Sequence, residues 1–371
     1  MDKNKRAFFE LVKAGLWERD VELRKHGATD YSRILQFATE QSVVGLVAAG
    51  LERVKDVKVP KEWALQFIGQ TLQIEQQNKA MNEFVAQLIE KLRNAGVYAL
   101  LVKGQGVAQC YDRPLWRSSG DVDLFLSDEN YEKAKKILVP LASEVETEYE
   151  GSKHLGMTID RWVVELHGSL RVGLPRRINR ELDDIQKDTF NGGNVRSWLN
   201  GRTQIFMLGK ENDIVYVFVH FFNHFYKEGV GLRQICDWCR LMWTYRDSLN
   251  YGLIEQRIKR MGLVSEWKAF YNLASRYLGM PDLDSSFMFQ DSRFDKKADR
   301  IMEFILKSGN MGHSRDNSFY GSKSFLVRKI GAFGRRIGDL CRHAMIFPLD
   351  SLRFMPTIVI NGLRSAAKGV G

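Results

Sequence analysis

Residues 97–126 read VYALLVKGQGVAQCYDRPLWRSSGDVDLFL and carry the clearest structural pattern of the chain. The apolar run 97–102 predicts a strand that ends at Lys103-Gly104. A short helix and a basic loop are expected next. Aliphatic side chains at 122, 124 and 126 then alternate with other side chains at 121, 123 and 125, which is the period of two that a strand requires. The stretch therefore predicts a strand, a glycine turn, a short helix, a loop and a second strand.

Two acidic residues lie at the start of the second predicted strand. Asp121 and Asp123 share one face of it, roughly 6.5–7 Å apart at the Cα level, because successive strand side chains point to opposite faces. Neighbouring carboxylates repel each other, and a bound divalent cation relieves that repulsion. Carboxylate oxygens are hard ligands, and such ligands favour Mg²⁺ or Mn²⁺. A solvated Asp-x-Asp without a metal is the alternative at this point.

A third carboxylate comes from the next pair of predicted strands. Residues 151–159 and 162–166 alternate as paired strands around a turn at Asp160-Arg161. In the second strand, Glu165 faces away from its apolar neighbours. We expect this strand to lie beside the Asp-x-Asp strand, at the usual spacing of about 4.8 Å. Glu165 would then complete a cage of three carboxylates.

Helical patterns flank this central region. Apolar residues recur at helical spacing before residue 92, where Pro60 opens a long helix to about Arg93, and again from Leu208 onwards. A short helix is expected over 300–307, after a polar linker at 281–297. The expected divisions are an N-terminal helical region 1–92, a core 93–204, a C-terminal helical domain 205–310 and a basic amphipathic tail 311–371.

Composition and charge narrow the class of protein. The chain has 371 residues, of which 44% are apolar and 27% charged, as in an ordinary globular protein of more than one compact unit. The net charge is +10, but residues 322–371 contain nine basic residues and two aspartates, so most of the excess lies in the tail. Four cysteines give no disulfide framework, and no signal core or apolar run of about 20 residues is present. We expect a cytoplasmic protein, with peripheral membrane contact as a further possibility.

Several motifs follow one another in a fixed order between about residues 30 and 280. They are Leu101-Val102-Lys103-Gly104 with Ala108 and Tyr111, Arg117-Ser118-Ser119-Gly120-Asp121-Val122-Asp123-Leu124, Val164-Glu165-Leu166-His167, His220 with His224, Leu232-Arg233 and Asp237. In this set and order the chain resembles the uncharacterised nucleotidyltransferase family, a branch of the polymerase-beta-like nucleotidyltransferase superfamily that is common in bacterial capsule and polysaccharide gene neighbourhoods. The resemblance implies an α+β fold, with a small mixed-sheet nucleotidyltransferase core between N-terminal and C-terminal helical regions.

The resemblance also implies roles for the motif residues. Asp121, Asp123 and Glu165 would be catalytic and hold one or two Mg²⁺ (or Mn²⁺) ions, for transfer of a nucleotidyl group from an NTP to a hydroxyl acceptor. Glu165 would hold the ion on the acceptor side and could help to accept the hydroxyl proton. The expected nucleotide-binding residues are Lys103, Gly104, Gln105, Arg117, Ser119 and Gly120. Residues expected to line the cleft are His167, His220, His224, Arg233 and Asp237.

One departure from the family pattern supports a second hypothesis. The superfamily normally has a serine after the glycine that follows the first strand, whereas this chain has Gly104-Gln105. A non-catalytic nucleotide- or partner-binding protein of the same fold is therefore the alternative to an enzyme, although the intact acidic triad favours catalysis. The acceptor is not specified by the sequence, and a link to capsule or polysaccharide biosynthesis rests on the resemblance.

Histidines and cysteines in the helical region raise the question of a zinc site. His220, His224, Cys236 and Cys239 have the spacing H-x3-H-x11-C-x2-C. On helices, however, the same spacings are those of ordinary neighbours on one face, and free cysteine often behaves as a small buried apolar residue. We favour a cleft-lining role for the histidines, with a buried polar network between helices as the alternative.

The tail mixes apolar and basic side chains at roughly helical intervals over residues 325–347. Such a helix can lie on an anionic membrane, or it can pack on the domain with a solvated basic face. Nucleic acid is the weakest of the partners considered, since few aromatic residues are interleaved for base stacking.

Overall fold

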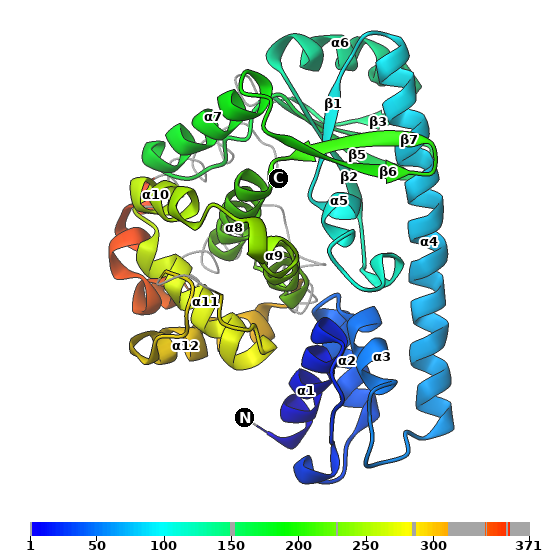
Figure 1. Ribbon diagram of the computed structural model, residues 1–371, viewed down its shortest axis with the longest axis vertical. Coiled ribbons are helices and arrows are strands. Elements are labelled where there is room, and N and C mark those ends of the chain that lie inside the picture. The colour runs from blue at the N-terminus through cyan, green and yellow to red at the C-terminus, as the bar shows by residue number, and fades with distance from the viewer. Residues whose placement is uncertain are drawn as a thin grey trace, which may run out of the picture.

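The computed structural model describes residues 2–148, 153–227, 229–283, 287–310, 338, 340–353 and 355–356. Within them the protein is an α+β structure, in which helices surround one seven-stranded mixed sheet (Figure 1). Short 3₁₀ helices occur at η1 (Arg24–His26), η2 (Pro114–Trp116), η3 (Val139–Leu141), η4 (Arg246–Ser248) and η5 (Ser292–Phe294). The α+β fold predicted from the sequence is confirmed.

The chain begins with three short helices and one long one. They are α1 (Lys3–Trp17), α2 (Tyr31–Glu40), α3 (Val44–Leu51) and α4 (Lys61–Asn94). Pro60 precedes the first residue of α4, as predicted. The 34 residues of α4 make a rod, about 50 Å long at 1.5 Å per residue. It runs along one side of the molecule from the N-terminal helices to the sheet (Figure 1).

The sheet has the strand order β3-β4-β5-β2-β1-β7-β6. The bounds are β1 (Ala99–Val102), β2 (Asp121–Leu126), β3 (Ala142–Val145), β4 (His154–Ile159), β5 (Trp162–His167), β6 (Val195–Asn200) and β7 (Thr203–Leu208). Strand β2 pairs antiparallel with β1 and parallel with β5, and β7 pairs parallel with β1. Strands β1, β2, β4 and β5 were predicted, whereas β3 and the β6–β7 hairpin were not. Because β7 pairs with β1, the sheet extends past residue 204, where the expected core ended.

The two faces of the sheet meet different partners. Aliphatic residues of β1, β2, β4, β5 and β7 form one core with α4 and with α6 (Asp128–Leu138), which begins after Ser127. The opposite face of β2 carries Asp121, Asp123 and Phe125, and Phe125 packs on Phe190 of α7 (Arg176–Phe190). Strand alternation thus separates an apolar face from the face that carries the acidic residues.

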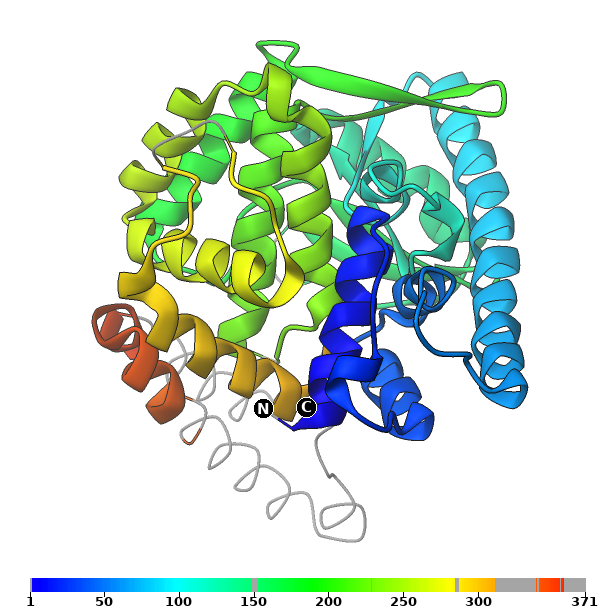
Figure 2. The same ribbon diagram turned by 60° about the horizontal axis from the view of Figure 1, so that its bottom comes forward.

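The C-terminal helices form the other half of the molecule. They are α8 (Lys210–Lys227), α9 (Leu232–Tyr245), α10 (Tyr251–Met261), α11 (Val264–Leu278) and α12 (Asp295–Ser308), the last beginning before the short helix expected at 300–307. Figure 2 shows α1 between these helices and the other N-terminal helices. The Trp17 indole donates a 2.5 Å hydrogen bond to the carbonyl of Leu278, and both helical regions contribute to one apolar core.

Only part of the predicted tail is described. Residues 311–337 and 357–371 lie outside the described residues, so most of the amphipathic pattern at 325–347 does too. In the described part, His343 and Phe347 are buried, and Asp350 accepts a hydrogen bond from Arg177. This part of the tail packs on the helical half. Among the described residues, no helix is long and apolar enough to cross a membrane.

Helices α1 and α3 approach closely at a glycine, which gives a test of the packing. A Cβ on Gly50 would lie 2.1 Å from the carbonyl oxygen of Leu11, so Gly50→Ala forces the two helices apart. We expect its free energy of unfolding to fall by about 1–3 kcal/mol. Gly69→Ala in α4, where nothing lies within 4 Å, should instead add about 0.5–1 kcal/mol. Denaturant unfolding measures both, and effects of the same sign would contradict this packing.

Candidate active site

The three predicted acidic residues converge in the structure. The parallel pairing of β2 with β5 places Asp123 opposite Glu165, and one carboxylate oxygen from each of Asp121, Asp123 and Glu165 lies within 4.8 Å of the others. Asp123 is buried, with 1% of its side chain exposed, whereas Glu165 is 28% exposed. A set of three carboxylates fits a hard divalent cation such as Mg²⁺ or Mn²⁺. Glu165 lies on the solvent side of this cluster.

Lys103 lies against the acidic cluster at the end of β1. Its Nζ is 2.6 Å from Oδ1 of Asp123. Its backbone has φ 57°, a conformation that residues other than glycine rarely adopt, and Gly104 follows at φ 41°. Burial acts to lower the pKa of Lys103, but Asp123, together with Tyr216, Asp121 and Glu165, outweighs burial and holds that pKa above the usual range. The lysine is therefore charged, and the strained backbone turns its ammonium group toward the carboxylates.

Two histidines contact the same carboxylates. His167 Nε2 is 2.8 Å from Asp123 Oδ1 and 3.4 Å from Glu165 Oε2, and His154 Nε2 is 3.2 Å from Glu165 Oε2. Burial opposes ionisation of Glu165, yet its contacts with His154 and His167 leave its pKa lowered. Burial also acts against the charged form of His167, but hydrogen bonding to Asp123 and to Glu165 together leaves its pKa raised.

His154 was not among the residues selected from the sequence, although a signal was present. A two-residue turn at Asp160-Arg161 pairs residues whose numbers are symmetric about it. Strand register therefore places His154 opposite His167, as the structure shows.

The acidic face opens into a pocket between the sheet and the helices α8 and α9. Its empty volume is about 500 Å³. Residues from both sides line it, including Lys103, Asp121 and Asp123 from the sheet side and His220, Arg233 and Asp237 from the helices. Of the predicted cleft residues, His220, Arg233 and Asp237 thus line the pocket. His167 lies between Asp123 and Glu165, and His224 lies behind His220, with their Nε2 atoms 3.1 Å apart.

The nucleotidyltransferase resemblance is tested by comparison with known proteins. A family model described as uncharacterised nucleotidyltransferase matches residues 27–279, which is more than half of the chain and includes every residue of the acidic site. The chain belongs to this nucleotidyltransferase family. No curated protein and no solved structure matches it. The acidic cluster is consistent with the catalytic site of a nucleotidyltransferase and compatible with a divalent metal.

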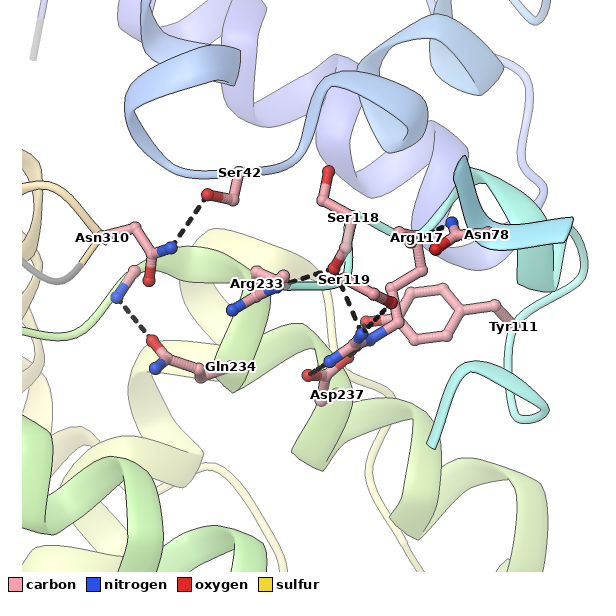
Figure 3. A network of polar contacts seen from close by, with 11 residues as sticks. Ser42, Asn78, Tyr111, Arg117, Ser118, Ser119, Arg233, Gln234, Asp237 and Asn310 are labelled. Carbon is pink, nitrogen blue, oxygen red and sulfur yellow. Dashed lines mark hydrogen bonds and ion pairs between the residues drawn. The ribbon is translucent and has the colours of Figure 1, made fainter. Parts of the chain in front are cut away.

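Arg117 lines the pocket and is held in a polar network (Figure 3). Its Nε and Nη2 donate to Oδ1 and Oδ2 of Asp237, at 2.7 and 2.6 Å, and Nη1 donates to Ser119 Oγ. Tyr111 also donates to Asp237. The guanidinium of Arg117, which is expected to hold phosphate, also joins the loop before β2 to helix α9.

Arg233 has more donors available than Arg117. Its Nη1 donates to the carbonyl of Ser118, and its Nε is buried with no hydrogen-bond partner among the described residues (Figure 3). Burial and the nearby Arg117 lower the pKa of Arg233. A buried guanidinium with an unused donor, in the wall of a pocket, fits an anionic group.

The other expected nucleotide-binding residues differ in their placement. Gly104 lines the pocket, whereas the Gln105 amide donates to Asn78 Oδ1 at 2.8 Å and is buried against α4. The Gln105 side chain therefore points away from the pocket. Ser119 accepts from Arg117, and Gly120 lies in the same loop directly before β2.

The two histidines and two cysteines whose spacing raised the question of a zinc site do not form one in the described part of the chain. Cys236 and Cys239 are fully buried in the apolar core, where burial raises the pKa of both thiols and keeps them protonated. The clusters of possible metal ligands among the described residues do not include them. Burial and Lys103 lower the pKa of His220, so it is neutral beside His224.

The acidic cluster predicts how stability depends on pH without metal. The charge of Asp123 and burial raise the pKa of Asp121 in the folded protein. Ionised Asp121 therefore destabilises the folded state at a pH above this raised pKa. The destabilisation is lost at a pH below the pKa of the unfolded chain, about 3.9. In EDTA, Asp121→Asn should therefore raise the free energy of unfolding at pH 8, and the gain should shrink as the pH is lowered. Urea unfolding between pH 8 and pH 4 measures this. Exposed Asp20→Asn is the control, and a gain that grew at lower pH would contradict the expectation.

The Arg117–Asp237 pair predicts a non-additive pair of substitutions. Asp237→Leu leaves a buried guanidinium without its counter-ion, which should cost about 3–5 kcal/mol of unfolding free energy. Replacing both partners by apolar residues, Arg117→Met with Asp237→Leu, should recover a large part of that loss. A double-mutant cycle by denaturant unfolding measures the coupling. Additive effects would show that the pair does not act as a unit.

Proposed function

We propose that this nucleotidyltransferase transfers a nucleoside monophosphate from an NTP to a hydroxyl group of an acceptor. One observation carries the proposal: the same pocket has the carboxylates of Asp121 and Asp123 on one wall and the cations Lys103 and Arg233 around it. Carboxylates suit a divalent metal, and buried cations suit a triphosphate. Family membership supports the same reaction class.

The acidic residues would hold the metal. Asp121, Asp123 and Glu165 offer the oxygen ligands that Mg²⁺ or Mn²⁺ prefers, within 4.8 Å of one another. When bound there, the cation supplies Lewis-acid stabilisation of the charge that develops on the phosphates. The lowered pKa of Glu165 keeps this residue ionised, which suits a ligand better than a general base.

The basic residues would position the triphosphate. Lys103 is a charged group within reach of both the acids and the pocket, and Arg233 has an unused buried donor. Arg117 would act through Asp237, by holding the loop before β2 against α9. Positioning and charge stabilisation are the main contributions that a protein makes to phosphoryl-type transfer.

For the acceptor we propose a sugar hydroxyl, and for the cellular setting a contact with an anionic membrane. A hydroxyl of a sugar would suit a link to polysaccharide biosynthesis, which rests on the family context. Contact of the tail with an anionic membrane is supported by Met345, Leu349 and Leu352, which are exposed at helical spacing with Arg342 and Arg353 nearby in the sequence. The buried residues His343 and Phe347 of the same segment face the protein instead.

Removal of the acidic pair tests the reaction. Protein, Mg²⁺ and each α-labelled NTP are incubated with cell extract, and the label is followed into product. Asp121→Asn combined with Asp123→Asn should reduce labelling at least about 10²-fold, since losses of 10–100-fold already follow removal of groups that only support metal ligands. Asp20→Asn is the matched control and should keep full activity.

Ligand binding separates the enzyme from the non-catalytic alternative. An NTP that binds only the folded protein adds about 2.7 kcal/mol of stability at 100 times its Kd. Mg²⁺-dependent stabilisation by an NTP, without transfer of label to any acceptor, would favour the nucleotide-binding protein. Neither stabilisation nor transfer with any of the four NTPs would contradict both functions.

A further inference from the structure

A second cluster of possible metal ligands adjoins the acidic site. One ligand atom from each of His154, Glu165 and His167 lies within 4.8 Å of the others. The antiparallel pairing of β4 with β5 places His154 opposite His167 and Gly156 opposite Glu165. Directly paired residues project to the same face of a sheet, so the three side chains emerge side by side.

The distances in this cluster match those of a tetrahedral metal site. His154 Nε2 and His167 Nε2 lie 3.2 and 3.4 Å from the same oxygen, Oε2 of Glu165. Ligands at 2.0–2.1 Å from a tetrahedral zinc ion are about 3.3–3.4 Å apart. Each of the two nitrogens thus already has the spacing from the Glu165 oxygen that two ligands of one ion have.

The donor set differs in kind from that of the acidic site. Two imidazole nitrogens and one carboxylate oxygen suit Zn²⁺ or Co²⁺, whereas Mg²⁺ prefers oxygen ligands alone. The His154 side chain is 42% exposed. The cluster therefore has access to solvent, from which an ion can enter and which can fill a fourth position.

A glycine beside Glu165 leaves room for a further carboxylate. A Cβ on Gly156, the strand partner of Glu165, would lie 2.6 Å from the Glu146 carboxylate. Glycine at this position lets the Glu146 carboxylate fold over the same face of the sheet. The negative charge of Glu146 beside Gly156 favours a cation on this face.

We propose that His154, Glu165 and His167 form a transition-metal site of the Zn²⁺ or Co²⁺ class, which shares Glu165 with the acidic site. The alternative is a set of hydrogen bonds in which the two imidazoles only neutralise Glu165. Added metal distinguishes the metal site from the hydrogen-bonded cluster, because a bound ion must replace the protons on the imidazole nitrogens that the hydrogen bonds require. The site needs no nucleotide, so its test does not depend on the transfer reaction.

The experiment uses the full-length protein, freed of metal by a chelator and titrated with Co²⁺ alone. We expect the visible absorption of a four- or five-coordinate Co²⁺ ion, with one equivalent bound and displaced by Zn²⁺. His154→Ala should lose this spectrum and weaken binding at least about 10-fold, which is the lower end of losses for supporting groups of metal sites. Circular dichroism checks that the variant is folded. We expect it to fold, because the His154 side chain is 42% exposed.

Two further variants locate the ion. His26→Ala, a histidine of η1 outside the cluster, should leave the spectrum unchanged. Asp121→Asn should also keep it, because Asp121 belongs only to the acidic cluster. Three results would overturn the proposal: no Co²⁺ bound by the wild-type protein, an unchanged spectrum in folded His154→Ala, or loss of the spectrum in Asp121→Asn but not in His154→Ala.

Discussion

The parallel pairing of β2 with β5 is the constraint around which the rest of the site is arranged. It places Asp123 directly opposite Glu165, although the two residues come from separate strands with α6, β3 and β4 between them in sequence. Because side chains alternate along a strand, a shift of the register by one residue would move one acid to the apolar face beneath α4 and α6. The aliphatic residues on that face fix the register, so the apolar core determines where the carboxylates meet.

The negative charges of the clustered carboxylates repel one another, and nearby cationic side chains offset this repulsion. Three acids lie within 4.8 Å of one another, and the most buried of them, Asp123, contacts both Lys103 and His167. A left-handed backbone at Lys103 is part of this arrangement. Strain and charge repulsion of this kind are common at functional sites, where the surrounding structure stabilises a local arrangement that would not form alone.

Local patterns predicted the sheet side of the site well. Alternation alone places Asp121 with Asp123 and turns Glu165 away from its apolar neighbours, and the turn at 160–161 also specifies the His154–His167 pair. The direction of the Arg117 and Gln105 side chains could not be predicted in this way. Asp237 lies 120 residues from Arg117, and Asn78 lies 27 residues before Gln105. Such partners depend on how helices dock, which periodicity does not encode.

The β6–β7 hairpin was missed for a related reason. Strand β6 lies at the edge of the sheet, and half of its residues are exposed. Its residues V-R-S-W-L-N lack the strict alternation of apolar and polar side chains that identifies a half-buried strand. Its pairing with β7, and the contact of Asn200 with the backbone of Asn82 in α4, are tertiary features.

The position of the pocket has a consequence for how the molecule unfolds. Its walls come from the sheet on one side and from α8 and α9 on the other, and the Arg117–Asp237 pair joins the two sides. The N-terminal helices share an apolar core with the C-terminal ones, so the sheet is enclosed between segments from both ends of the chain. Because of these contacts we expect the sheet and the helical half to unfold as one cooperative unit. A ligand in the pocket would bind them together, and resistance to limited proteolysis would report its occupancy across the whole molecule.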